Sequence, residues 1–240
     1  MTIEIINLNK KYNNFLAVKN INFKIKKGSI VGLLGPNGCG KTTTIGMLLG
    51  LIKPSSGTVL IDGQNIENEN IRTNILEKMN FISPYVELPK KLTVEENLKV
   101  YGKLYGVKNL NDKIFHLMQD LNLIEFKKRK TGELSSGQKN RVSLAKALIN
   151  EPEILFLDEP TASLDPDVGD YIRGYIENFV SKQGTTVLLA SHNMNEVERL
   201  CNKVMMMKNG EIIDSGTCGS LINKHGRKSL EETFLKIVRE

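Results

Sequence analysis

The chain has 240 residues, a hydrophobic content of 40% and a formal net charge of +6 at pH 7. Its length fits one large α/β domain that buries its own core, and no apolar run approaches the roughly 20 residues needed to cross a bilayer. Three scattered cysteines argue against a disulfide framework or a zinc site, and with no signal-peptide pattern at the start they indicate a protein of the reducing cytosol.

The N-terminal quarter of the chain is rich in strand signals. Residues 3–8 and 17–25 largely alternate apolar and polar side chains, which predicts half-exposed antiparallel strands. A turn at Lys27-Gly28 leads into the apolar run 30–34, which predicts a buried strand. Another short strand is expected at residues 58–61, ending at a turn at Asp62-Gly63.

A glycine-rich loop follows the buried strand and precedes a predicted helix at residues 44–49. It fits the pattern G-x-x-x-x-G-K-[ST], whose glycines let successive backbone N–H groups point at an anion. Its lysine can reach the β- and γ-phosphates of a nucleotide, and its first threonine can bind Mg²⁺. We therefore predict nucleotide binding by Gly35, Pro36, Asn37, Gly38, Cys39, Gly40, Lys41, Thr42 and Thr43.

Cys39 lies inside this loop, ahead of a helix N-terminus. Such a position tends to lower the pKa of a thiol. We therefore expect alkylation of Cys39 to block nucleotide binding and ATP to protect it.

The middle of the chain changes to helical periodicity. Apolar residues recur at helical spacing in residues 92–98 and 112–118, which predicts a helical subdomain. The basic cluster 127–130 is interpreted as a solvated loop, and no nucleic-acid partner is expected. Beyond it, short apolar strands at 154–157 and 186–190, separated by a helix, are typical of a parallel sheet covered on both faces.

Two carboxylates stand where the strand at 154–157 ends, which is the edge at which open α/β sheets bind ligands. Asp158 is a candidate Mg²⁺ ligand, and Glu159 is a candidate base for the water that attacks the γ-phosphate. Two acids at a strand end are weak evidence alone. Together with a phosphate-binding loop upstream they predict an ATPase site.

The segment Leu-Ser-Ser-Gly-Gln at residues 134–138 precedes a predicted helix that runs through Leu148. Taken alone, it is a helix cap. With the order of the other motifs, it resembles the signature of the ATP-binding-cassette (ABC) superfamily, LSGGQ, with Ser136 in place of the first glycine. The tail at 229–239, with its LEE-x-F pattern, and the run SH-x-M-x-EVE at 191–198 resemble bacterial export-type ABC ATPases.

The resemblance covers nearly the whole chain and implies roles for further residues. Tyr12 matches the aromatic that stacks on adenine, His192 matches the switch histidine at the γ-phosphate, and Asp165 lies in the D-loop with Ser163. Lys41, Glu159 and His192 would then be catalytic, and Thr42 and Asp158 would hold Mg²⁺. The nucleotide-binding residues from the signature are Ser135, Gly137 and Gln138.

The implied fold is a P-loop NTPase core, a mainly parallel sheet flanked by helices, with an N-terminal antiparallel β subdomain and an inserted α-helical subdomain. One domain would span residues 1–240, with the helical subdomain at about 85–150 and a C-terminal helix at about 229–239. One element departs from the family pattern: the expected glutamine is missing near Pro84, where Ser83 or Glu87 are possible substitutes. The departure bears on coupling to a partner and not on nucleotide binding.

The resemblance also implies partners. ATP would be sandwiched between the phosphate loop of one cassette and the signature of another, a second copy or a relative. A separate transmembrane permease would complete a transporter, an exporter by the resemblance of the tail, with this chain on the inner face of the cell membrane. The alternative is a soluble ABC ATPase that acts on cofactor assembly, ribosomes or DNA.

Overall fold

The computed structural model describes residues 1–83, 86–162 and 164–239, and within these ranges two β-sheets form the frame of the molecule. The first sheet is antiparallel throughout, in the order β2-β1-β4-β5. Its strands are β1 (Ile3–Tyr12), β2 (Phe15–Ile25), β4 (Ser56–Ile61) and β5 (Gln64–Asn65). The antiparallel strands predicted at the start of the chain are confirmed and are longer than the alternating pattern indicated.

The second sheet has six strands in the order β10-β9-β3-β8-β7-β6, all parallel except β10. Every residue of β3, β7 and β8 is buried, as expected for apolar strands covered on both faces. The strands are β3 (Ile30–Leu34), β6 (Met79–Ile82), β7 (Ile154–Asp158), β8 (Thr186–Ser191), β9 (Lys203–Lys208) and β10 (Glu211–Gly216).

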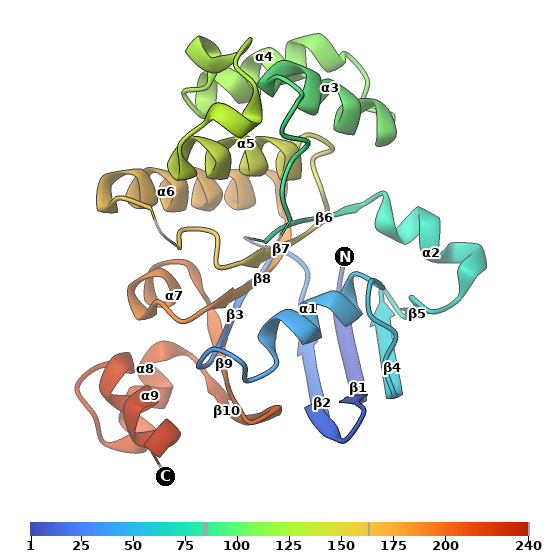
Figure 1. The fold of residues 1–240 in the computed structure, drawn as a ribbon. Helices are drawn as coiled ribbons and strands as arrows, with labels where there is room; N and C mark the ends of the chain where they lie inside the picture. Colours follow the sequence, from blue (N-terminus) through green and yellow to red (C-terminus); the bar gives the residue numbers. More distant parts are fainter. Residues whose placement is uncertain (84–85, 163, 240) are drawn as a thin grey trace.

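Helices cover both sheets (Figure 1). Helices α3, α4 and α5 form a layer of their own at one end, α6 packs below them, and α8 and α9 form a small unit at the C-terminus. The helices are α1 (Lys41–Leu48), α2 (Glu69–Leu76), α3 (Val94–Leu104), α4 (Leu110–Asp120), α5 (Ser136–Leu148), α6 (Pro166–Gln183), α7 (Met194–Leu200), α8 (Cys218–His225) and α9 (Leu230–Arg239).

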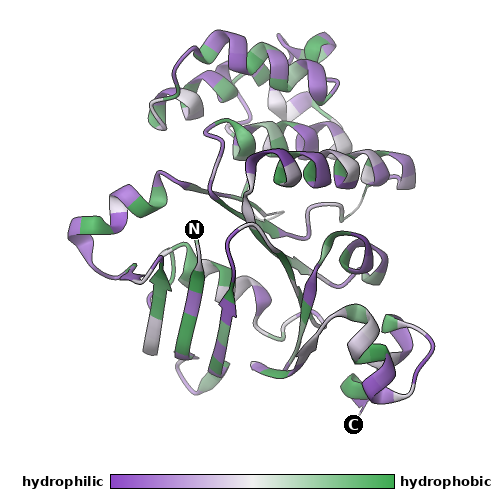
Figure 2. Cartoon of the chain, turned by 180° about the vertical axis from the view of Figure 1, so that it is seen from behind, coloured by the Kyte–Doolittle hydropathy of each residue, from purple (hydrophilic) through white to green (hydrophobic). Residues whose placement is uncertain are grey.

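Three apolar clusters hold these layers together. The first lies between the two sheets and encloses α1, with Ile45, Met47 and Leu48 packed against strands of both. The second lies between the parallel sheet and helices α3 to α6, and the third seats α8 and α9 against β9 and α7. The strands between the helical layers are the most continuously apolar part of the chain (Figure 2). Cys39 of the phosphate loop and the helix α1 that follows it both belong to the first cluster.

The structure also contains elements that the sequence patterns did not predict. These are α2, the hairpin of β9 and β10, and α8. The predicted helical region, about residues 85–150, contains α3, α4 and α5, which share one core. None of the helices within the described ranges is both long enough and apolar enough to span a bilayer.

Candidate functional site

The glycine loop connects β3 to α1 in a conformation that requires glycine at particular positions. A Cβ at Gly35 would lie 2.5 Å from the carbonyl oxygen of Met207, and one at Gly40 would lie 2.5 Å from that of Ala17. Gly40 also has a φ of 110° and is the N-cap of α1 without a side-chain hydrogen bond to the helix. Because no side chain caps α1, the start of the helix suits an external acceptor such as an anion.

Lys41 begins α1, and its ammonium group lies inside the loop. Nζ donates to the carbonyl oxygens of Gly35 at 2.7 Å and Pro36 at 3.3 Å, and it lies 3.9 Å from Oε1 of Glu159. Only 5% of the residue is exposed. A cation is thus held at the point where the loop and the strand β7 meet.

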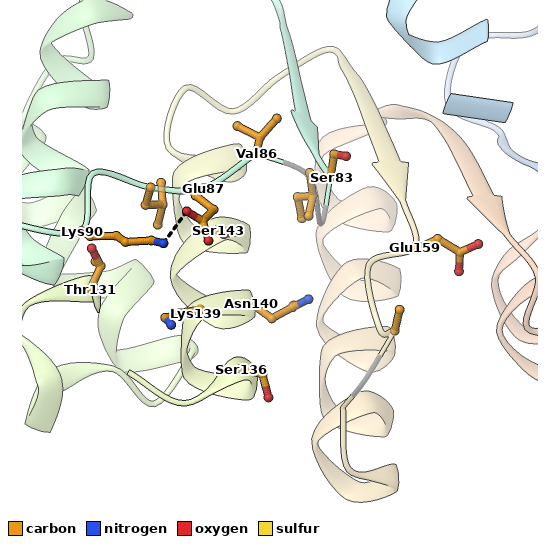
Figure 3. Close-up of a pocket in the computed structure, with 13 residues that line it drawn as sticks. Ser83, Val86, Glu87, Lys90, Thr131, Ser136, Lys139, Asn140, Ser143 and Glu159 are labelled. Carbon is orange, nitrogen blue, oxygen red and sulfur yellow. Dashed lines mark ion pairs between the residues drawn. The ribbon is translucent and has the colours of Figure 1, made fainter. Parts of the chain in front are cut away.

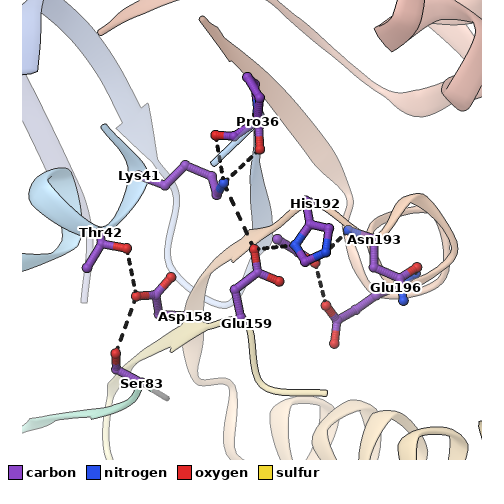
Figure 4. Close-up of polar contacts among 11 residues, drawn as sticks. Pro36, Lys41, Thr42, Ser83, Asp158, Glu159, His192, Asn193 and Glu196 are labelled. Atoms are coloured by element: carbon purple, nitrogen blue, oxygen red, sulfur yellow. Dashed lines mark hydrogen bonds and ion pairs between the residues drawn. The ribbon is translucent and has the colours of Figure 1, made fainter. Parts of the chain in front are cut away.

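Asp158 ends β7 and is joined to the loop by a hydrogen bond. Oγ1 of Thr42 donates to Oδ2 of Asp158 at 3.0 Å, and Oγ of Ser83 contacts the same oxygen at 3.4 Å (Figure 4). Burial raises the pKa of Asp158, and the Thr42 hydrogen bond opposes that rise. Hydroxyl and carboxylate oxygens are the donors that Mg²⁺ prefers, so this group fits such an ion.

The two candidate substitutes for the missing glutamine lie in different surroundings. Ser83 follows β6 and reaches Asp158, whereas Glu87 pairs with Lys90 at 2.7 Å and its side chain is 67% exposed. Ser83 is therefore the residue of this segment that contacts the acidic strand end. Pro84, the matching position itself, lies outside the described residues.

Glu159 and His192 face each other across the ends of two neighbouring strands. Glu159 has a φ of 51°, rare for a residue with a side chain, and its N–H donates to the carbonyl oxygen of Ala190 at 2.8 Å. Its Oε1 lies 2.7 Å from Nδ1 of His192. The backbone at Glu159 thus turns the carboxylate toward both Lys41 and His192 (Figure 4).

A cavity of about 290 Å³ lies against the phosphate loop. Tyr12, at the end of β1, is 43% exposed, and Nζ of Lys10 lies 4.8 Å from the centroid of its ring. The lining residues come from β1, β2, the loop, α1 and the end of β7: Tyr12, Phe15, Ala17, Asn37, Gly38, Gly40, Lys41, Thr42, Thr43, Asp158 and Glu159.

A second cavity, of about 260 Å³, lies on the other side of Glu159 (Figure 3). It separates the segment after β6 from helix α5, and Ser83, Glu87, Lys90, Ser136 and Asn140 are among its lining residues. Glu159 lines both cavities. The carboxylate therefore stands at the boundary between the phosphate loop and the helical layer.

The predicted signature residues lie at the start of α5. Ser135 is the N-cap, its Oγ accepts from the N–H of Gln138 at 3.3 Å, and its own N–H donates to Oε1 of Gln138 at 2.9 Å. This capping box confirms the helix-cap interpretation. Among the described residues, the cavity at the phosphate loop is lined by neither Ser135, Gly137 nor Gln138.

Asp165 lies apart from this cavity as well. It is exposed at the N-cap of α6, ahead of Pro166. Ser163, its neighbour in the predicted D-loop, lies outside the described residues.

The expectation of a reactive thiol at Cys39 is wrong. The residue is 4% exposed and belongs to the core between the sheets. Burial raises the pKa of its thiol, and this effect outweighs the lowering by Lys41 and by backbone N–H groups. Because the side chain of Cys39 is buried in the core, the residue can offer only its backbone to a nucleotide.

One buried acid near the site was not predicted from the sequence. Glu196 on α7 is 1% exposed and accepts hydrogen bonds from Ser191 and Thr161, each at 2.7 Å. It falls within the SH-x-M-x-EVE run. A pattern along the chain gives no sign that its side chain reaches Thr161, 35 residues away.

Known proteins of one family match this chain. The family model described as "ABC transporter" matches residues 18–162. "Probable multidrug ABC transporter ATP-binding protein YbhF" of Escherichia coli (strain K12) is 34% identical over 99% of the chain, which spans 42% of that protein's length. "Linearmycin resistance ATP-binding protein LnrL" of Bacillus subtilis (strain 168) is 34% identical over 98% of the chain and 75% of its own length.

A solved structure extends the similarity to three dimensions. A dimeric ATP-binding cassette in a post-hydrolysis state, bound to ADP and Pi, is 28% identical with a TM-score of 0.84, and the match covers 90% of this chain and 98% of that one. The mixed α/β fold and the P-loop core expected from the sequence are thereby confirmed. The chain belongs to the ABC transporter family and has the fold of an ATP-binding cassette.

Proposed function

We propose that this chain is the motor subunit of an ABC exporter, which binds and hydrolyses ATP to drive a separate transmembrane subunit. The observation that carries the proposal is the convergence of Lys41, Thr42, Asp158, Glu159 and His192 at the carboxyl edge of the parallel sheet, around a loop with an uncapped helix start. These are the groups that phosphoryl transfer to water requires.

In this proposal each residue has one task. Tyr12 stacks on the adenine, and the N–H groups of residues 35–43 and Nζ of Lys41 hold the phosphates. Glu159 accepts a proton from the attacking water, and His192, hydrogen-bonded to Glu159, lies where it can contact the γ-phosphate. Of the two carboxylates among the described residues that line the cavity, Asp158 accepts a hydrogen bond from Thr42, which leaves Glu159 as the acceptor for water.

Thr42 and Asp158 would hold Mg²⁺, with Ser83 beside Asp158 taking the role of the missing glutamine. The ion would neutralise phosphate charge. This assignment is supported by the oxygen donors that meet at Oδ2 of Asp158. The exposed, ion-paired Glu87 lacks such a position.

The proposal includes a second cassette, a further copy of this chain, with the signature residues Ser135, Gly137 and Gln138 of one copy, together with Asp165, completing the phosphate site of the other. Two observations support it. The start of α5 is exposed and does not line the cavity at the phosphate loop. A relative of known structure is a dimer in its post-hydrolysis state.

The transmembrane partner would dock near the cavity between α5 and the segment after β6, so that Glu159 senses its movement. The chain would then lie on the cytoplasmic face as a peripheral membrane protein. The names of the relatives, a multidrug transporter protein and a linearmycin resistance protein, support export. The helical layer would be a subdomain of about residues 85–150 in one cassette.

The test is the variant Glu159→Gln, studied by light scattering and by steady-state hydrolysis. With the base removed, we expect ATP binding to persist and turnover to fall on the order of 10²- to 10⁴-fold. Because ATP then stays in the interface, the dimer should accumulate in ATP and dissociate in ADP. Wild-type turnover in this variant would overturn the assignment of the base.

The matched control is Glu153→Gln, which changes a partly exposed carboxylate on the loop before β7. It should keep wild-type turnover, and its fraction of monomer in ATP should equal that of the wild type. Purification of the wild type from solubilised membranes tests the partner. Recovery of a membrane protein supports a transporter, and recovery of soluble machinery alone contradicts it.

A further inference from the structure

Two segments of the candidate site are held together by a carboxylate beneath them. Strands β7 and β8 pair up to Asp158 and Ala190, and the N–H of Glu159 makes one more hydrogen bond, to Ala190. Beyond this point the two segments of the chain separate, although Glu159 and His192 remain within hydrogen-bonding distance of each other. Among the described residues, β7 and β8 have no ladder pair beyond Asp158 and Ala190.

Glu196 spans this gap. Its Oε1 accepts from Oγ1 of Thr161, two residues after Glu159, and its Oε2 accepts from Oγ of Ser191, directly before His192, each at 2.7 Å. All three residues are buried. One side chain thus connects the segments that carry the two reactive groups.

The carboxylate is itself fixed in place. The backbone N–H of Glu196 donates to Oδ1 of Asn193, the N-cap of α7, at 3.3 Å, and the N–H of Asn193 donates to Oγ of Ser191 at 3.0 Å. Val197 and Leu200, on the same helix, are buried in the cores. The hydroxyl of Ser191 therefore has one acceptor for its proton and one donor to its oxygen, which sets its direction.

Burial raises the pKa of Glu196, and the hydrogen bonds from Ser191 and Thr161 act against that rise. A buried carboxylate costs desolvation free energy, whereas an apolar side chain of the same size would fill the space without that cost. What the carboxylate adds is direction, since each oxygen binds one hydroxyl.

We propose that Glu196 is a positioning residue for ATP hydrolysis, one that sets the distance between Glu159 and His192 by bonding Thr161 and Ser191. The inference rests on the proposed function for its effect on turnover. It predicts a loss in kcat without a loss in ATP affinity, because Glu196 reaches neither the phosphate loop nor its cavity.

The test compares Glu196→Ala with Glu196→Gln and with Glu198→Ala. Glu198 is the matched control, because it lies on the same helix and accepts from the N–H of Leu230, away from the site. We expect Glu196→Ala to lose on the order of ten- to a hundredfold in kcat with KM for ATP unchanged. Glu196→Gln keeps the reach to both hydroxyls, but its NH2 group can only donate, so one hydroxyl has to accept instead, and its kcat should lie between those of Glu196→Ala and the wild type. Glu198→Ala should match the wild type.

A double-mutant cycle separates positioning from general loss of stability. In a His192→Ala background, Glu196→Ala should add little further loss, because the group that it positions is gone. Thr161→Val, which keeps the shape and removes one hydroxyl, covers the case in which Glu196→Ala folds poorly, and it should lower kcat with KM unchanged. Equal kcat in Glu196→Ala and Glu198→Ala, or full additivity with His192→Ala, would overturn the proposal.

A readout independent of turnover keeps this inference distinct from the proposed function. The chain has three histidines, so the ring nitrogens of His192 can be assigned by ¹⁵N NMR with the His192→Ala variant. We expect their chemical shifts to change in Glu196→Ala and to stay fixed in Glu198→Ala. A shift change in a protein without ATPase activity would contradict the proposed function alone, and unchanged shifts would contradict the positioning role.

Discussion

The two helix starts that we assign to the same phosphates, those of α1 and α5, are built in opposite ways. The start of α1 is enclosed by both sheets and has Gly40 as an N-cap without a side-chain bond. The start of α5 is exposed, and Ser135 and Gln138 cap each other. At α1 no side chain caps the helix, whereas at α5 the Ser135 side chain accepts from the N–H of Gln138, and this capping box does not involve the N–H groups of Ser136 and Gly137.

This difference indicates that α1 and α5 contribute to the proposed phosphate site in different ways. The phosphate loop, together with Lys41 and Asp158, forms one half of the proposed site, and a single copy of the chain supplies all of this half. The signature helix is folded and capped on its own, so it is ready to be presented to a second copy. Stability of α5 and affinity for ATP should therefore respond to different substitutions.

The largest expected effect concerns the far end of α5, which Lys146 anchors. This lysine is 6% exposed, donates to the carbonyl oxygen of Phe81 at 2.9 Å and lies over the rings of Phe81 and Tyr101. Desolvation lowers its pKa to about 8. Between pH 8 and 10.5 the unfolded chain holds a proton that the folded chain has lost, so stability rises with pH by up to about 3 kcal/mol from this group.

Urea unfolding of Lys146→Met across this pH range measures that contribution. The variant should lack the rise, and Lys139→Met, which changes an exposed lysine of the same helix, should keep it. If the free energy of unfolding of Lys146→Met rises with pH as steeply as that of the wild type, burial does not lower the pKa of Lys146.

The next effect concerns α1. Lys41→Ala removes the cation from the loop, and we expect ATP affinity to fall by about ten- to a hundredfold, the cost of a charge-assisted hydrogen bond. Calorimetry with ATP measures the loss, and Lys53→Ala, an exposed lysine, is the control. Undiminished affinity in Lys41→Ala would contradict the phosphate-loop assignment.

A smaller effect is expected at the start of α5. Ser135→Ala removes the N-cap and should lower the free energy of unfolding by about 1 kcal/mol. ATP affinity of the monomer should not change, because Ser135 does not line the cavity at the phosphate loop. Ser136→Ala, next to the cap, should leave stability within about 0.5 kcal/mol of the wild type. Weaker ATP binding by monomeric Ser135→Ala would mean that the signature completes the site of its own chain.

The smallest effect is expected at Cys39. With its thiol buried and its pKa raised, alkylation by a polar maleimide should be slow in the folded protein, with and without ATP. Mass spectrometry of the labelled peptide measures it. Rapid labelling that ATP prevents would instead show that the thiol of Cys39 is exposed and reactive.

The parts of the site that lie in one stretch of chain were predictable from the sequence. The glycine loop, the acids that end β7 and the cap of α5 each carry a local pattern with a physical reason. Cys39 was misjudged because the dipole of a nearby helix is a local property, whereas the burial of its side chain depends on both sheets.

The remaining features depend on contacts between distant parts of the chain. The hydrogen bond between Glu196 and Thr161 and the position of Lys146 over the ring of Tyr101 arise only when helices and strands pack. Helix α2 and the β9–β10 hairpin lacked an evident periodic signal. The choice of Ser83 over Glu87 needed the end of β6 to be placed beside Asp158.

The most direct test of the shared site is a cross-link between copies. In the Glu159→Gln background, one tagged chain carries Asn37→Cys in the phosphate loop and an untagged chain carries Ser136→Cys at the start of α5, both exposed positions. Under mild oxidation with ATP, we expect a disulfide-linked dimer of the two chains, which is absent without ATP and absent between two Asn37→Cys chains. An ATP-bound dimer that forms without this cross-link would contradict the assignment of the signature to the partner's phosphates.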